Sequence, residues 1–244
     1  MALSDDSTPH SAPSAAARCL DGITIMLVDD SRSVSEAIRI MAVRSGARIR
    51  RADSLQSAGR HLMIYRPDVV IIDLALPDGS GVELARELTE KSDPRPAVLL
   101  ISAAEEAVTA EAAKQAGADG YLVKPIQSFS VFQAAILDMM PPELRPNVDG
   151  IGHITADQIG TDALLHDLET VHDLLREALA EDNDEIYDFA AQFLAGVART
   201  VRDTPLAERA DALFDAAPGQ RHDMAASAIE LVAERMSNGW AKAS

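Results

Sequence analysis

Cysteine, aromatic residues and long apolar runs are scarce in this 244-residue sequence. The single cysteine, Cys19, cannot form an internal disulfide, which is typical of proteins from a reducing compartment. No run approaches the roughly 18 apolar residues that a membrane-spanning helix needs. Asp5 and Asp6 precede the first lysine or arginine and no apolar stretch follows them, so we expect no secretory signal. The sequence therefore predicts a cytoplasmic protein that does not insert into membranes.

Basic residues are scarce as well. Lysine and arginine number 22 against 39 acidic residues, which gives a formal net charge of −17. From Pro141 onward the imbalance is steeper, with 20 acidic and 8 basic residues. Because a negative field repels phosphate backbones and anionic lipids, we expect neither a nucleic-acid partner nor a lipid surface.

The length suits two domains of roughly 100–150 residues each, and 47% hydrophobic residues is a globular composition. Residues 1–21 are rich in Ala, Ser and Pro without periodicity, which predicts a disordered tail. A Pro-Pro pair predicts a linker over residues 141–154. This linker separates a first domain, at residues 22–140, from a helical output or interaction domain at residues 155–240.

The first domain alternates short apolar runs with stretches of helical length. A weaker run, Ala47–Arg51, lies between the first two helical stretches. Runs that are apolar at every position suit strands buried on both faces, so the pattern predicts an α/β fold with a five-stranded, parallel, doubly wound sheet. The four strong runs and the polar residues that end them are Ile23–Val28 before Asp29 and Asp30, Val69–Ile72 before Asp73, Val98–Ile101 before Ser102, and Tyr121–Val123 before Lys124.

Beyond the linker the period changes to that of helices. Apolar residues recur at three- and four-residue spacing in several stripes, and Thr204-Pro205 is typical of a helix start. Three or four amphipathic helices in this length predict an all-α bundle. The two clearest stripes are Leu164, Leu168, Val171, Leu175 and Ala178, then Ile186, Phe189, Phe193, Val197 and Val201.

Polar side chains at the carboxyl ends of parallel strands meet at one edge of a sheet, where ligands bind. Three carboxylates, Asp29, Asp30 and Asp73, would converge there and repel one another without a counter-ion. Hard oxygen ligands in that number match Mg²⁺. Lys124 and the Ser102 hydroxyl would complete a site for a phosphoryl group.

These residues resemble the receiver domain of bacterial two-component response regulators over about residues 22–140. The resemblance implies a flavodoxin-like fold for that domain, followed by an unrecognised helical region. The motifs that carry it are Val28-Asp29-Asp30-Ser31, the segment from Asp73 to Gly81 (DLALPDGSG), Ser102-Ala103, and Tyr121-Leu122-Val123-Lys124-Pro125.

The resemblance assigns a role to each position of the site. It implies that Asp73 accepts a phosphoryl group from a sensor histidine kinase or phosphotransfer protein. Mg²⁺ would be held by Asp30, Asp73 and the backbone carbonyl of Ala75, with Asp29 reaching it mainly through water.

Lys124 would pair with the phosphoryl oxygens, and its bond to Pro125 would be cis. Ser102 and Ala103 would also adjoin the phosphoryl group. Ser102 and Tyr121 would act as the switch pair that remodels the domain surface after phosphorylation.

The sequence carries fewer signals for the function of the region after Pro141. No catalytic set is recognisable after Pro141, so we expect no enzyme, and the leading hypothesis is a phosphorylation-dependent switch of protein–protein contacts. An unidentified downstream protein is the expected partner, and a homodimer is a further candidate. A DNA-binding transcriptional regulator remains an alternative, as does a helical phosphatase. A phosphotransfer output is a third, although neither His166 nor His172 is followed by the lysine and glycine of such domains.

Overall fold

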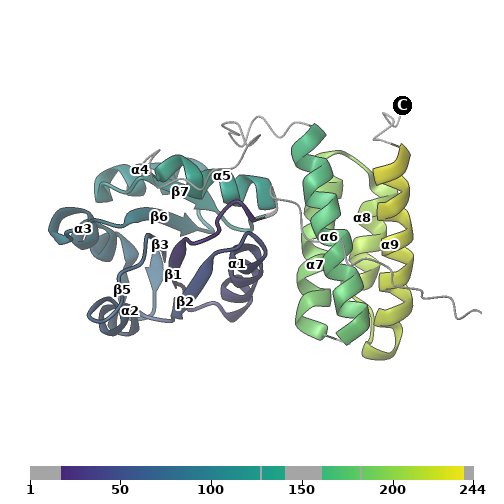
Figure 1. Cartoon of the computed structure of the whole chain (residues 1–244), viewed down its shortest axis with the longest axis horizontal. Coiled ribbons are helices and arrows are strands. Elements are labelled where there is room, and N and C mark those ends of the chain that lie inside the picture. Colours follow the sequence, from purple (N-terminus) through teal and green to yellow (C-terminus); the bar gives the residue numbers. More distant parts are fainter. Residues whose placement is uncertain (1–17, 127, 141–160, 182, 239–244) are drawn as a thin grey trace, which may run out of the picture.

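The computed structural model describes residues 18–126, 128–140, 161–181 and 183–238 (Figure 1). The expected linker at 141–154 lies outside these residues, and so do residues 1–17 of the expected tail and the ends of the expected helical domain. Residues 18–21 differ from the expectation. Cys19 and Leu20 are fully buried in the core, so these two residues do not belong to a disordered tail, because their apolar side chains pack instead of facing solvent.

Five parallel strands form the central sheet in the order β2-β1-β3-β6-β7, the predicted doubly wound, flavodoxin-like arrangement. The direction of strand addition reverses beside β1, which is where ligands bind in such sheets. The strands are β1 (Thr24–Val28), β2 (Arg48–Ala52), β3 (Val69–Asp73), β6 (Ala97–Ser102) and β7 (Gly120–Val123).

Helices cover both faces of the sheet, which explains why the inner strands β1 and β3 are apolar at nearly every position, whereas the edge strand β2 carries three arginines. Alternate residues of β1 and β3 enter two separate cores: Ile25 and Ile71 face one, whereas Met26 and Ile72 face the other. The helices on the first face are α1 (Arg32–Arg44) and α5 (Phe129–Met139), and those on the second are α2 (Leu55–Leu62), α3 (Gly81–Lys91) and α4 (Glu106–Ala116).

A two-stranded hairpin, β4 (Ala75–Leu76) and β5 (Gly79–Ser80), follows β3 and was not predicted, because two-residue strands leave no periodicity. It turns the chain back so that α3 begins at Gly81, directly against the end of β3. A Cβ atom on Gly81 would lie 1.9 Å from the backbone oxygen of Asp73. Only glycine therefore fits this approach.

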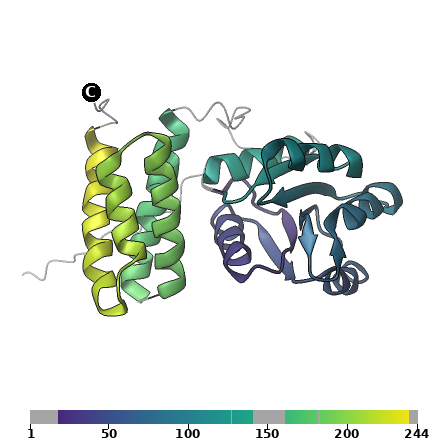
Figure 2. The ribbon, with the colours of Figure 1, turned by 180° about the vertical axis from the view of Figure 1, so that it is seen from behind.

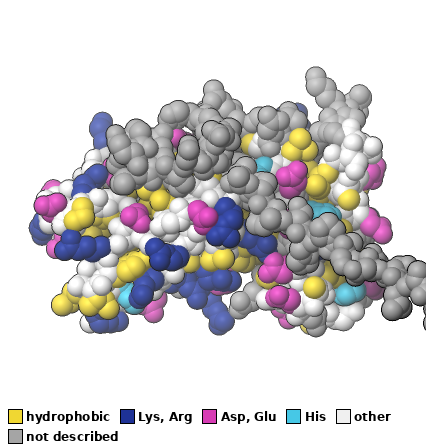
Figure 3. All heavy atoms as spheres, viewed as in Figure 1, with side chains coloured by type: hydrophobic (Ala, Val, Ile, Leu, Met, Phe, Trp, Pro, Cys, Tyr) yellow, Lys and Arg dark blue, Asp and Glu magenta, His cyan; other side chains and the backbone are white. Residues whose placement is uncertain are grey.

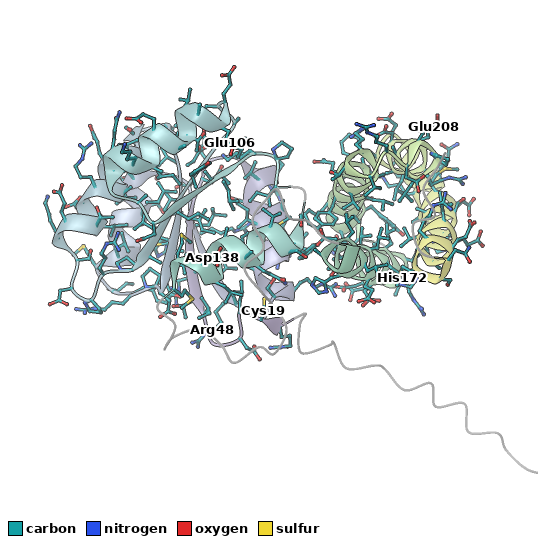
Figure 4. The ribbon with its side chains drawn as sticks, turned by 90° about the horizontal axis from the view of Figure 1, so that it is seen from above. Cys19, Arg48, Glu106, Asp138, His172 and Glu208 are labelled. Carbon is teal, nitrogen blue, oxygen red and sulfur yellow. The ribbon has the colours of Figure 1, made fainter. Side chains whose placement is uncertain are left out.

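The C-terminal region is helical, as predicted. Figure 4 shows these helices nearly end-on, and their apolar side chains form a shared interior. The elements are α6 (Thr161–Glu181), α7 (Asp184–Thr200), α8 (Thr204–Phe214), a short 3-10 turn (Pro218–Gln220) and α9 (Arg221–Asn238). Asp203 rather than Thr204 caps α8, because its carboxylate accepts a hydrogen bond from the amide of Leu206 at 3.1 Å. No helix among the described residues combines the length and apolar character needed to cross a membrane.

The bundle lies beside α1 and α5 (Figure 2). One continuous cluster of buried apolar residues joins it to the sheet. Phe129 at the start of α5 meets Phe193 and Phe189 of α7 edge-on, with ring centroids 5.0 and 6.1 Å apart. Arg44 at the end of α1 forms an ion pair with Glu177 of α6. Apolar burial supplies most of this contact, because a partly exposed ion pair contributes little.

Charge is unevenly spread over the surface. Residues 32–66, which form α1, β2 and α2, hold eight arginines and two acidic residues. Figure 3 shows lysine and arginine side chains gathered on this side of the molecule. The total of −17 therefore conceals a locally basic face.

Replacing Gly81 with alanine tests the close approach of α3 to β3. The new methyl group must displace the Asp73 backbone, so Gly81→Ala is expected to lower the free energy of unfolding by about 2–3 kcal/mol. Urea unfolding followed by circular dichroism measures it. The matched control is Gly59→Ala within α2. The new methyl group there would meet no atom within 4 Å outside the local helix backbone, so the free energy of unfolding is expected to rise by about 0.5–1 kcal/mol. Equal effects of the two substitutions would contradict the packing described here.

The buried carboxyl group of Asp167 makes stability depend on pH. Burial raises its pKa to about 6, above the roughly 3.9 of an unfolded chain. The native state therefore binds more protons than the unfolded state between about pH 4 and pH 6, so stability falls as the pH rises through that window, by about 2–3 kcal/mol in all. Asp167→Asn should remove this contribution, because an amide does not titrate. The free energy of unfolding is measured for both proteins between about pH 4 and pH 6, and only that of the unaltered chain should show this fall. Parallel curves would contradict the prediction.

Candidate functional site

Three carboxylates converge at the carboxyl edge of the sheet. Asp29 and Asp30 follow β1, and Asp73 ends the neighbouring strand β3, with Val28 paired to Ile72 in register. One oxygen of each aspartate lies within 4.8 Å of the corresponding oxygens of the other two. Asp29 and Asp73 are buried and Asp30 is exposed, so the cluster opens to solvent on one side.

Lys124 neutralises part of this charge. Its Nζ lies 2.6 Å from Asp29 Oδ2 and 2.8 Å from Asp73 Oδ2, and its side chain is only 11% exposed. The lysine follows β7, and its backbone amide donates to the Ser102 carbonyl at 2.7 Å. The bond between Lys124 and Pro125 is cis. One ammonium group thus joins the ends of three strands.

The pKa of Asp29 is raised chiefly by burial and also by repulsion from Asp73, while Lys124 and the Ser31 amide oppose the shift. Ser31 donates its backbone N–H to Asp29 Oδ1 at 2.8 Å. Oδ2 pairs with Lys124 Nζ at 2.6 Å and has no further donor among the described residues. A buried oxygen with spare acceptor capacity beside two further carboxylates fits a hard divalent cation such as Mg²⁺.

Other predicted site residues lie around this cluster. Ser102 ends β6, beside β3, and its hydroxyl accepts the amide of Ala104 at 3.0 Å. Ala103 is exposed, and Ala75 donates its amide to Asp73 Oδ1 at 3.4 Å. The structure therefore groups these residues near the carboxylates, while their individual roles stay predictions.

Tyr121 is oriented differently. Its hydroxyl donates to Glu106 of α4 at 3.1 Å, and this bond raises the pKa of the phenol. The ring packs with the core that contains α2, α3 and α4. Tyr121 therefore links β7 to α4 instead of joining the carboxylate cluster.

Two features of the site left no signal in the sequence. The Asp78 carboxylate accepts the amides of Leu55 and Gln56 at 2.8 and 2.9 Å, which lowers its pKa and ties the segment after Asp73 to the start of α2. In addition, a cavity of about 500 Å³ lies between the segment Lys124–Ile126, α1 and the helices α7 and α8. Both depend on contacts between residues more than 20 positions apart.

Comparisons with known proteins identify relatives of the domain that carries this site. The family model for the response regulator receiver domain matches residues 25–136. The chain is 36% identical over 101 residues to the KDP operon transcriptional regulatory protein KdpE of Escherichia coli, covering 41% of this chain and 44% of that protein. It is 30% identical over 157 residues to the probable transcriptional regulatory protein TcrX of Mycobacterium tuberculosis, covering 63% and 62%. The chain thus spans about half the length of the curated relatives it matches.

Among solved structures, the chain is similar to the chemotaxis response regulator CheY4 of Vibrio cholerae, at 25% identity and a TM-score of 0.40. The similarity covers 43% of this chain and 88% of that one. The family match ends before the bundle, at residue 136. The sheet and its helices, with the carboxylate cluster at the carboxyl edge, are a response regulator receiver domain.

Proposed function

We propose that this chain is a response regulator in phosphorelay signalling, in which Asp73 accepts a phosphoryl group from a sensor histidine kinase or phosphotransfer protein. One observation carries the proposal: the Asp73 carboxylate lies 2.8 Å from Lys124 Nζ, inside a cluster of three carboxylates. A nucleophile, a fixed cation and a place for a metal ion are what phosphoryl transfer requires.

In the proposed reaction an Asp73 oxygen attacks the phosphorus of a phosphohistidine. An O–P bond forms to give an acyl phosphate while the P–N bond breaks, and the histidine nitrogen keeps the electron pair. Lys124 stabilises negative charge on the phosphoryl oxygens, and Ser102 and Ala103 border them. Asp29, Asp30, Asp73 and the Ala75 carbonyl would hold Mg²⁺, which supplies further neutralisation when bound.

The switch is proposed to start at Ser102. In this proposal the hydroxyl moves toward the phosphoryl group and gives up the bond that it accepts from the Ala104 amide, which changes the segment before α4. Tyr121 then gives up its bond to Glu106 and turns inward. These exchanges alter the surface formed by α4 and β7, which would shift the domain between two surface states.

The bundle is proposed as the output element, acting by contact with an unidentified downstream protein or with a second copy of the chain and not by catalysis. It offers little to a phosphotransfer role, since burial lowers the pKa of His166 and His172 is also partly buried. A helical phosphatase output remains the weaker alternative.

A DNA-binding transcriptional regulator is the second candidate. Two observations favour it: several relatives are named transcriptional regulators, and α1, β2 and α2 present a face rich in arginine. Against it, the described helices α6–α9 carry five arginines and no lysine, far fewer than their acidic residues. Titration with duplex DNA at low and at moderate salt separates the two candidates.

Phosphorylation at Asp73 is directly testable. Incubation with acetyl phosphate and Mg²⁺ should give protein-bound phosphate that is stable to acid and labile to alkali, and Asp73→Asn should abolish it, because an amide oxygen is a poor nucleophile. Asp53→Asn is the control, since Asp53 also follows a strand, β2, but is exposed and outside the cluster. Labelling that survives in Asp73→Asn would refute the assignment.

Magnesium binding can be measured without any phosphodonor. Asp30 is the exposed member of the cluster, so Asp30→Asn should leave the fold intact while weakening Mg²⁺ binding at least about ten-fold. Isothermal titration of the full chain with MgCl₂ measures the effect, and Asp53→Asn should bind as the unaltered chain does. Equal affinity of the Asp30 variant would remove Asp30 from the metal site.

A further inference from the structure

The first turn of α5 is held by a residue from the bundle. The backbone N–H of Ser130 donates to Asp167 Oδ1 of α6 at 3.2 Å, and the Ser130 hydroxyl lies 3.3 Å from the same oxygen. Ser128 caps α5 from within, by accepting the Val131 amide at 3.1 Å. Because the first amides of a helix lack partners inside it, Asp167 completes a cap that α5 does not supply itself.

The same turn adjoins the phosphoryl-binding lysine. Ser128, the cap residue of α5, lies four positions after Lys124. The intervening segment also borders the bundle, since Lys124, Pro125 and Ile126 line the 500 Å³ cavity together with residues of α7. Helix α7 thus borders Lys124–Ile126, and α6 borders the first turn of α5.

The carboxyl group of Asp167 is buried where it meets the first turn of α5. It is 1% exposed, and its Oδ2 atom is buried without a hydrogen-bond partner. A buried carboxylate in this state costs free energy, which is why its pKa is raised.

We propose that Asp167 is a positioning residue for Lys124, through which the bundle controls phosphoryl acceptance at Asp73. By holding the first turn of α5, Asp167 sets where the segment from Lys124 onward lies, and hence the distance of Nζ from Asp29 and Asp73. At a site this little exposed, small changes in that distance change the electrostatic interaction strongly. This inference rests on the proposed function of Asp73.

The test measures the rate of Asp73 labelling by acetyl phosphate and Mg²⁺ in the full chain. Asp167→Ala removes the acceptor oxygen and is expected to slow labelling about ten-fold, whereas Asp167→Asn keeps an acceptor oxygen and should restore the rate to within about two-fold. The small donor needs no docking surface, so the rate reports the site itself.

Glu177→Ala is the matched control for a merely structural role. It breaks the ion pair between Arg44 and Glu177, which also joins the bundle to the receiver domain but lies away from the first turn of α5. The labelling rate of this variant should stay within about two-fold of the unaltered chain. Equal slowing by Glu177→Ala and Asp167→Ala would show that general docking matters, and would overturn the proposal.

An unchanged rate in Asp167→Ala would overturn it as well. If that variant fails to fold, Ser130→Ala carries the test: it removes the hydroxyl that bonds Asp167, and should slow labelling about three-fold. An unchanged rate in this variant then overturns the proposal. Failure of the proposed function is separately recognisable, because the unaltered chain would then take no label on Asp73.

Discussion

The contact on which the site depends is the ion pair of one ammonium group with two buried carboxylates. Lys124 lies 2.6 Å from Asp29 and 2.8 Å from Asp73, and these residues follow or end three different strands. Without the lysine, the two buried carboxylates would repel one another with no opposing charge between them. The positions of β1, β3 and β7 are therefore linked electrostatically at the edge where phosphoryl chemistry is proposed.

That edge is rigid because the sheet behind it is packed on both faces. Alternate residues of β1 and β3 enter separate cores, and Gly81 brings α3 against the backbone of Asp73. Only one of the two cores extends into the bundle, through α1 and α5. The bundle is thus packed against the helix that follows Lys124, while α4 and Tyr121 lie with the other core.

Some features could be predicted because they depend on short stretches of chain. An apolar run that ends in Asp73 or Lys124 indicates a buried strand and a polar side chain at its carboxyl end. Asp78 and Asp167 could not be found this way. Each bonds backbone amides 22 or more positions away, and nothing near either residue in the sequence indicates its partner.

The sequence by itself determined the alternation of strands and helices, the strand ends that carry carboxylates, and the helical character of the C-terminal region, since hydrophobic period and local polarity are properties of neighbouring residues. The tertiary structure alone decided where the bundle packs, that Cys19 and Leu20 belong to the core, and that Tyr121 bonds Glu106. These contacts join distant segments, and whether they form depends on how whole surfaces fit together, which no short pattern encodes.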